Sequence, residues 1–358
     1  MLFARTAVAA GTAETPGVFY AGLRVATVDG FTLDLPDTGE NGEFFGRGGN
    51  GSGEKNPYPQ LRALAVAESG TRVLLAATHG PCGTGQQRLA EDLLAAMGPG
   101  MLVLADSNFA SWKLWRAAAG TGAALCWRMS ASFTLPMLEV LPDGIYLSQL
   151  KPPRKKDGPP IRVRVIEYSV ITTDDNGEET SELFASATTL LDVNAHPAID
   201  LAQLYHARWQ AETGIGDLKI AIRGGPEVVL RSKTPAGVEQ EFWAMLCVYQ
   251  AIRELITYAA PTGLDPGRVS FTRALEAARD SVIRAALPPC RTEARRRTPG
   301  RRTGQPPQPA PRPSRAQRTP RPRTRRFTPL PPPQEQRPPR PHRDLPRPPA
   351  PPHPANPP

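Results

Sequence analysis

Proline placement constrains the fold of this chain more than any other feature. Of the 42 prolines in 358 residues, 25 lie between Pro288 and Pro358, and a residue without a backbone N–H interrupts helix and sheet alike. The same stretch contains 17 Arg, no Lys and three acidic residues. We therefore predict that residues 288–358 form a disordered Pro/Arg-rich tail and not a domain.

The basic balance of the chain belongs to this tail. The whole chain carries a formal net charge of +9, whereas its first 287 residues hold 26 Lys and Arg against 31 acidic residues, a net of −5. The four cysteines stand far apart without metal-ligand spacing, which excludes a zinc ribbon and a disulfide framework. The most apolar long stretch, 242–260, contains Gln250, Arg253 and Glu254, so we expect no membrane span and a cytoplasmic protein.

The chain before the tail has the pattern of one α/β domain. Residues 1–18 have no period and predict a frayed lead-in; 19–287 form the domain. Two β segments follow, hinged at Asp29-Gly30, with a carboxylate at the strand end. Further strands are expected at 61–67 and 72–78, which suit a hairpin, and at 101–105, which ends in Asp106, and 123–129. A β-rich insertion spans about 135–189, and helices are expected at 86–97, 111–119, 201–220, 239–258 and 269–286.

The sharpest chemical signal lies in the helix predicted at 201–220. Tyr205, Arg208, Glu212 and Lys219 stand at offsets of 0, 3, 7 and 14, so at about 100° per residue they fall within roughly 60° of one another. One helix face thus gathers an acid, two bases and a phenol. The simpler interpretation is a surface ion pair between Arg208 and Glu212.

The two aspartates also have simpler interpretations. An Asp before Gly is usually a turn residue, as Asp29 can be. Asp106 can be an N-cap, because the residues that follow it can begin a helix. Only the occurrence of all these motifs in one order favours chemistry.

The residues together resemble a family. The spacing Y-x-x-R-x-x-x-E-x6-K matches the signature of the DDE transposases of the insertion sequence four family. The phrases GLRVATVDGFTLDLPDT (22–38), LVLADSNF (102–109), LRSKTP (230–235) and VSFTRAL (269–275) are similar to stretches that this family carries in the same order. The resemblance covers about residues 17–287.

The resemblance implies a ribonuclease H-like catalytic core with a β-rich insertion, followed by helices and the tail. Its three metal-binding catalytic carboxylates would be Asp29, Asp106 and Glu212. Two Mg²⁺ ions are the implied cofactors, for which Mn²⁺ can substitute, and hard oxygen ligands suit such ions. Tyr205, Arg208 and Lys219 would contact DNA phosphates beside the cut.

The resemblance also implies function and partners. We expect a DNA transposase that performs metal-dependent cleavage and strand transfer at insertion-sequence ends, in cut-and-paste transposition. Its partner would be double-stranded DNA, both element ends and target, on which the protein would act as a homodimer associated with the nucleoid.

The origin of the tail and the activity of the chain each have an alternative interpretation. Family members carry an extra amino-terminal region, and the tail composition is typical of out-of-frame GC-rich sequence, so we expect a truncated copy with a frameshifted end. A genuine polycationic tail would give the same composition. Two functional alternatives to an active transposase also stay open: an inactive transposase remnant that binds DNA nonspecifically through its Arg-rich tail, and a stand-alone nuclease that cuts without strand transfer.

Overall fold

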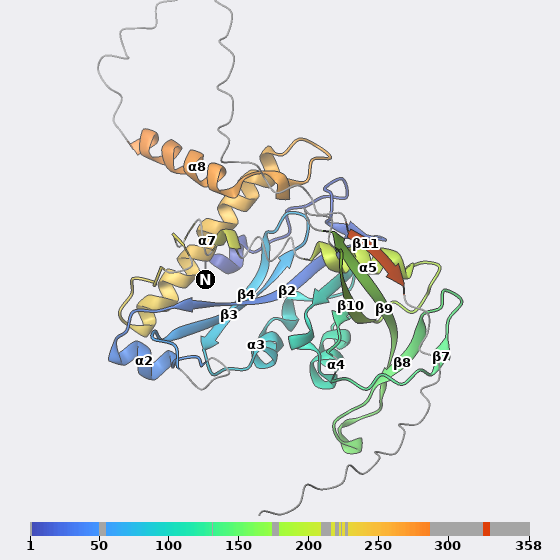
Figure 1. Ribbon diagram of the computed structural model, residues 1–358. Helices are drawn as coiled ribbons and strands as arrows, with labels where there is room; N and C mark the ends of the chain where they lie inside the picture. Colours follow the sequence, from blue (N-terminus) through green and yellow to red (C-terminus); the bar gives the residue numbers. More distant parts are fainter. Residues whose placement is uncertain are drawn as a thin grey trace, which may run out of the picture.

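The computed structural model describes residues 2–49, 55–130, 132–173, 179–208, 216–218, 222, 224–225, 228–286 and 325–329 (Figure 1). Its centre is a mixed sheet in the order β4-β3-β2-β5-β6-β10-β9-β8-β7. The strands are β1 (Phe19–Tyr20), β2 (Leu23–Asp34), β3 (Gln60–Glu68), β4 (Leu74–Pro81), β5 (Met101–Ala105), β6 (Ala124–Arg128), β7 (Glu139–Val140), β8 (Tyr146–Leu150), β9 (Ile161–Thr173), β10 (Glu179–Thr188) and β11 (Arg325–Pro329). The α-helices are α1 (Phe3–Thr6), α2 (Gly39–Phe45), α3 (Gln86–Asp92), α4 (Trp112–Gly120), α5 (Ala198–Ala207), α7 (Pro235–Ala259) and α8 (Phe271–Ala286).

The sheet combines an antiparallel half with a parallel centre. β3 pairs antiparallel with both β2 and β4, which confirms the predicted hairpin. β5 lies parallel to β2, and β6 lies parallel to β5. The central strands are buried on both faces, as β5 illustrates with four of its five residues buried. Such burial is typical of strands covered by helices on both sides.

Alternate residues of the central strands face different helices. Val28, Ala105 and Trp127 pack in one cluster with residues of α3 and α4. Leu104 and Cys126 pack instead with α5. The odd-numbered residues near the carboxyl end of β2, Phe31 and Leu33, pack against α7. Because successive side chains of a strand point to opposite faces, α3 and α4 cover one face, and α5 and α7 cover the other.

The hinge predicted at Asp29-Gly30 is wrong. β2 continues through both residues as one strand of 12 residues, and Gly30 pairs with Leu64 of β3. A Cβ on Gly30 would lie 3.2 Å from Nε2 of Gln86, the first residue of α3. The glycine therefore allows α3 to approach the strand closely, and no turn is involved. Asp29 lies within the strand and not at its end.

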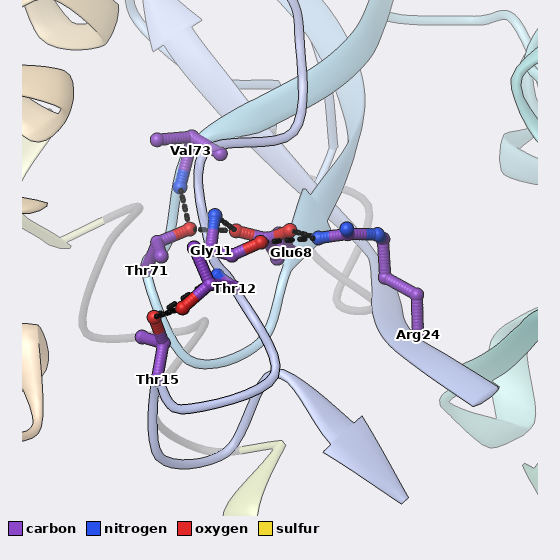
Figure 2. A network of polar contacts seen from close by, with 7 residues as sticks. All are labelled: Gly11, Thr12, Thr15, Arg24, Glu68, Thr71 and Val73. Carbon is purple, nitrogen blue, oxygen red and sulfur yellow. Dashed lines mark hydrogen bonds and ion pairs between the residues drawn. The ribbon is translucent and has the colours of Figure 1, made fainter. Parts of the chain in front are cut away.

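The lead-in 1–18 is packed, and the prediction that it is frayed is also wrong. Phe3 of α1 is buried, and its ring lies 5.4 Å from that of Trp243. Gly11 donates its N–H to Oε2 of Glu68 at 2.8 Å, and the same carboxylate forms an ion pair with Arg24 (Figure 2). These contacts join residues far apart in the sequence, so no local pattern in 1–18 could reveal them.

Part of the predicted tail also has regular structure. β11 pairs antiparallel with β9, from Arg325 opposite Thr172 to Pro329 opposite Tyr168. β8 covers β9 only between Ile161 and Val165, which leaves the rest of that strand edge open to another strand. The prediction of disorder is therefore wrong for these five residues. The other residues of 287–358 lie outside the described part of the chain.

Between Asp106 and Tyr205 the structure places four strands, β7 to β10, in the span predicted as a β-rich insertion. β10 pairs with β6 and thereby joins these strands to the central sheet. Among the described residues, no helix has the length and apolar character needed to cross a membrane.

Candidate active site

Asp29 and Asp106 lie side by side on neighbouring parallel strands. The ladder between β2 and β5 pairs Val28 with Ala105. Asp29 follows Val28 within β2, and Asp106 follows Ala105 just beyond the end of β5. Neighbouring strands lie about 4.8 Å apart. Two segments that are 77 residues apart in the sequence thus bring these aspartates to neighbouring positions at the centre of the sheet.

Both carboxylates belong to the face that α5 covers. Asp106 is two residues beyond Leu104, so it lies on the same side of the sheet as Leu104, which packs against α5 residues. Asp29 is next to Val28, which packs toward α3 and α4, so Asp29 lies on the opposite side from Val28. Asp106 occupies the N-cap position of a short 3₁₀ turn, Ser107–Phe109, but its side chain makes no capping hydrogen bond. The simpler N-cap interpretation of Asp106 therefore does not account for its carboxylate.

α5 brings Tyr205 and Arg208 to the same region. The helix packs through Ala198, Leu201 and Ala202, a spacing that puts these residues and Tyr205 on its buried side. Tyr205 is 3% exposed, Arg208 is 4% exposed, and the guanidinium carbon lies 5.3 Å from the centre of the tyrosine ring. Both side chains are therefore held within the site and not on an outer surface.

Two polar atoms at this point lack hydrogen-bond partners among the described residues. They are Oδ1 of Asp106 and the hydroxyl of Tyr205, both buried. Burial raises the pKa of Tyr205, Arg208 lowers it and Asp106 raises it further, which places the phenol within electrostatic range of both charges. A buried polar atom without a partner costs about 1–3 kcal/mol, so the site is typical of one that a ligand completes.

The comparisons with known proteins decide the family. Residues 20–251 match the family of transposase DDE domains. The chain belongs to that family. It is also 29% identical, over 264 residues, to the transposase InsG for insertion sequence element IS4 of Escherichia coli K12. This match covers 72% of the chain but 58% of the relative, so the chain spans just over half of that relative's length.

These matches confirm the resemblance to transposases of the insertion sequence four family and, at the level of the family, the enzyme class that it implied. Among solved structures, the chain is similar to the piggyBac transposase in a synaptic complex with hairpin DNA, with 10% identity and a TM-score of 0.39. That similarity covers 76% of this chain and 56% of the other.

The DDE domain places two of its three predicted carboxylates together, whereas Glu212 and Lys219 lie outside the described residues. Within the described residues, no group of three His, Cys, Asp or Glu side chains could hold a metal ion. Asp29 accepts a hydrogen bond from the N–H of Gly30 at 2.8 Å, and the Oδ1 of Asp106 has no partner within the part of the chain that the structure describes. Two adjacent carboxylates with a buried oxygen to spare fit a divalent cation that takes a further ligand from elsewhere in the chain.

Arg128 also belongs to this region, although it was not among the residues predicted from the sequence. It ends β6 one position beyond Trp127, the partner of Ala105, so it continues the row of Asp29 and Asp106 across a third strand. Its guanidinium lies 4.4 Å from the centre of the Phe184 ring and contacts Glu182 at 3.2 Å. Its charge lowers the pKa of Tyr205. The rule that pointed to Asp106, a polar residue at the carboxyl end of a buried strand, would also have found Arg128.

Proposed function

We propose that this chain is the catalytic part of a DNA transposase that performs metal-dependent cleavage and strand transfer at insertion-sequence ends. The observation that carries the proposal is the placement of Asp29 and Asp106 on neighbouring strands, with a buried oxygen of Asp106 and with Tyr205 within electrostatic range of both Asp106 and Arg208. Family membership supplies the reaction class.

The fold supports a ribonuclease H-like core. The parallel strands β2, β5 and β6 lie between two layers of helices. The β-rich strands enter the chain between the second carboxylate and α5. This is the arrangement that the resemblance implied, with an insertion between Asp106 and Glu212.

In this proposal Asp29, Asp106 and Glu212 hold two Mg²⁺ ions, for which Mn²⁺ can substitute. Bound divalent ions would activate the attacking hydroxyl and stabilise the leaving oxygen in an in-line displacement at phosphorus. The residues of the chain prepare the site for this chemistry. Asp29 and Asp106 are half-buried, and two neighbouring carboxylates that are partly removed from water attract a cation more strongly than they would in bulk solvent.

Arg208, Arg128 and Tyr205 would act on the DNA. Arg208 and Arg128 bring positive charge within electrostatic range of Tyr205, where it would offset the charge of an incoming phosphate. Tyr205, with its pKa raised, keeps its proton at neutral pH and so can donate a hydrogen bond to a phosphate oxygen. Lys219 would add a further phosphate contact, as the family signature implies.

Double-stranded DNA is the proposed partner. Because a transposase must cut two element ends, we propose a homodimer assembled on DNA and hence association with the nucleoid. The competing hypothesis is an inactive remnant that binds DNA only through its Arg-rich tail. Removal of residues 288–358 would abolish all DNA binding by such a remnant.

The test is a cleavage assay on duplex DNA that carries both flanks of the chain's own gene, with and without Mg²⁺. Glu212→Gln and Asp29→Asn should each reduce the cleavage rate at least about a hundredfold, equivalent to ~2.7 kcal/mol. DNA affinity should change little. Asp34→Asn is the matched control, because this carboxylate lies on the same strand and bonds Nε2 of Gln60 at 2.8 Å.

Two results would contradict the proposal. One is cleavage by Asp29→Asn at the rate of the unmodified chain. The other is an unmodified chain that binds DNA without cleaving it in Mg²⁺ or Mn²⁺, with all binding lost on removal of the tail.

A further inference from the structure

A compact group of cations lies on a different part of the domain, where β8 connects to β9. The connection has the sequence Lys-Pro-Pro-Arg-Lys-Lys-Asp-Gly-Pro-Pro from 151 to 160. Its four cations, at 151, 154, 155 and 156, are all exposed, as is Arg116 of the adjacent helix α4. We call these five residues the α4 basic patch: Arg116, Lys151, Arg154, Lys155 and Lys156.

The loop is fixed on α4. Nε1 of Trp112 donates to the carbonyl of Pro159 at 3.3 Å, and Nη1 of Arg116 donates to the carbonyl of Asp157 at 3.1 Å. Gly158 has a φ of +144°, and a Cβ there would lie 2.9 Å from Nη1 of Arg116 and 3.0 Å from the Trp112 ring. Glycine is therefore required for this close approach. Figure 1 shows the connection running beside α4.

The composition of the loop also keeps its cations in place. Pairs of prolines flank the segment from Arg154 to Gly158 on both sides, and proline restricts the backbone before any ligand binds. Lys155 to Asp157 form a 3₁₀ turn. Little backbone entropy thus remains to be lost on binding, which favours the affinity of a preformed surface.

The charge of the patch is largely uncompensated. Its single acidic neighbour in the loop is Asp157, which contacts Nε of Arg154 at 3.4 Å. Within the described part of the chain, no ion pair involves the side chains at 151, 155 or 156. Five cations and one carboxylate give the patch a net charge of +4, whereas the first 287 residues of the chain together carry a net charge of −5. Such segregation creates a local positive potential that attracts a polyanion.

The patch is separate from the carboxylates. Asp29 and Asp106 belong to the face that α5 covers, whereas the patch is built on α4, which packs on the opposite face. It therefore cannot hold the phosphate that is cleaved. Exposed Lys and Arg side chains at successive positions of a loop are typical of contacts to a repeated backbone phosphate, which position a duplex without reading its sequence.

We propose that the α4 basic patch binds the phosphate backbone of a duplex DNA segment that lies away from the site of cleavage. This inference rests on the proposed DNA-processing function. It adds a second DNA contact, on the opposite side of the sheet, that steers and orients the duplex. The lysines act as point charges, so the contact is independent of base sequence.

The test compares salt dependence of binding to a 30-base-pair duplex for three forms of the full-length chain. The patch variant changes Lys151, Arg154, Lys155 and Lys156 to Gln. The control variant changes four exposed cations beside and on α7 and α8 to Gln, namely Lys233, Arg268, Arg279 and Arg284. The slope of log K against log [salt] falls by about 0.9 for each DNA phosphate that the protein no longer neutralises.

We expect the patch variant to lose about 3 to 4 units of slope and the control variant to keep the slope of the unmodified chain. A double variant, Lys155→Gln with Lys156→Gln, should lose about 2 units and serves if the fourfold variant melts at a lower temperature. An unchanged slope in the double and fourfold variants overturns the proposal. So does an equal fall in the control variant, because the charge would then act without regard to position.

The cleavage assay separates this inference from the proposed function. If the patch variants lose slope while the unmodified chain fails to cleave any DNA, the patch is a DNA contact and the transposase proposal fails. If cleavage depends on Asp29 and Glu212 but the slopes do not change, the patch proposal fails alone.

Discussion

Glu68 provides a sharp test of how the amino-terminal segment is held. Its side chain is fully buried, and it accepts hydrogen bonds from the N–H of Gly11, from the hydroxyl of Thr71 and from Arg24 (Figure 2). Thr71 Oγ1 also accepts the N–H of Val73 at 3.3 Å. One carboxylate thus joins the segment before β1, strand β2 and the β3–β4 turn.

Glu68→Ala removes the acceptor of all three donors. Loss of one partner of a buried ion pair typically costs about 3–5 kcal/mol. Because the side chain of Arg24 is 25% exposed, water recovers part of this loss, and we expect the free energy of unfolding to fall by ~3 kcal/mol. Arg24→Met should cost a similar amount, since it leaves Glu68 charged and without its cation.

The measurement is urea unfolding followed by circular dichroism, on both single variants and the double variant. The cycle should give a coupling energy of roughly 1–3 kcal/mol between the two residues. A loss below about 1 kcal/mol for Glu68→Ala, the level of an exposed ion pair, would refute the inference that the segment is held by this carboxylate.

Two further predictions concern buried charge. Arg253 is fully buried and forms an ion pair with Asp217, and its Nε donates to the hydroxyl of Tyr249 at 3.2 Å. Arg253→Met should lower the free energy of unfolding by ~3–5 kcal/mol in the same assay. A fall of less than about 1 kcal/mol would show that the ion pair contributes little to stability. Burial lowers the pKa of His79 below its ordinary 6.5, against the smaller opposing effect of Glu239. Below pH 6.5 the unfolded chain therefore binds a proton at His79 more readily than the folded chain does, so this contribution to stability is complete above pH 6.5 and is lost as the pH falls below it. The melting temperature of His79→Leu should depend less on pH between about 7.5 and 5.5 than that of the unmodified chain. An equal pH dependence of the two melting temperatures would contradict this.

Patterns that depend on neighbouring residues were predictable from the sequence. The apolar run 101–105 became β5 with the same bounds, and the hairpin expected at 61–78 formed as β3 and β4. Period and turn chemistry suffice for such features.

Features that depend on distant contacts were not predictable. Asp29-Gly30 has the composition of a turn, but the approach of Gln86 decides the conformation of Gly30. The lead-in has no period, yet Phe3 packs against Trp243 and Gly11 bonds Glu68. These contacts with distant residues hold the segment in place. The adjacency of Asp29, Asp106 and Arg128 is a property of strand order, which the sequence alone does not specify.

The proposed metal site of the carboxylates is tested most directly by titrating the full-length chain with Mn²⁺ and counting bound ions by electron paramagnetic resonance. The Asp106→Asn variant should lose at least roughly tenfold in Mn²⁺ affinity, ~1.4 kcal/mol. Asp92→Asn on α3, a carboxylate paired with Arg88, is the control and should bind as the unmodified chain does. Equal Mn²⁺ affinity and stoichiometry in Asp106→Asn and in the unmodified chain would contradict the proposed active site.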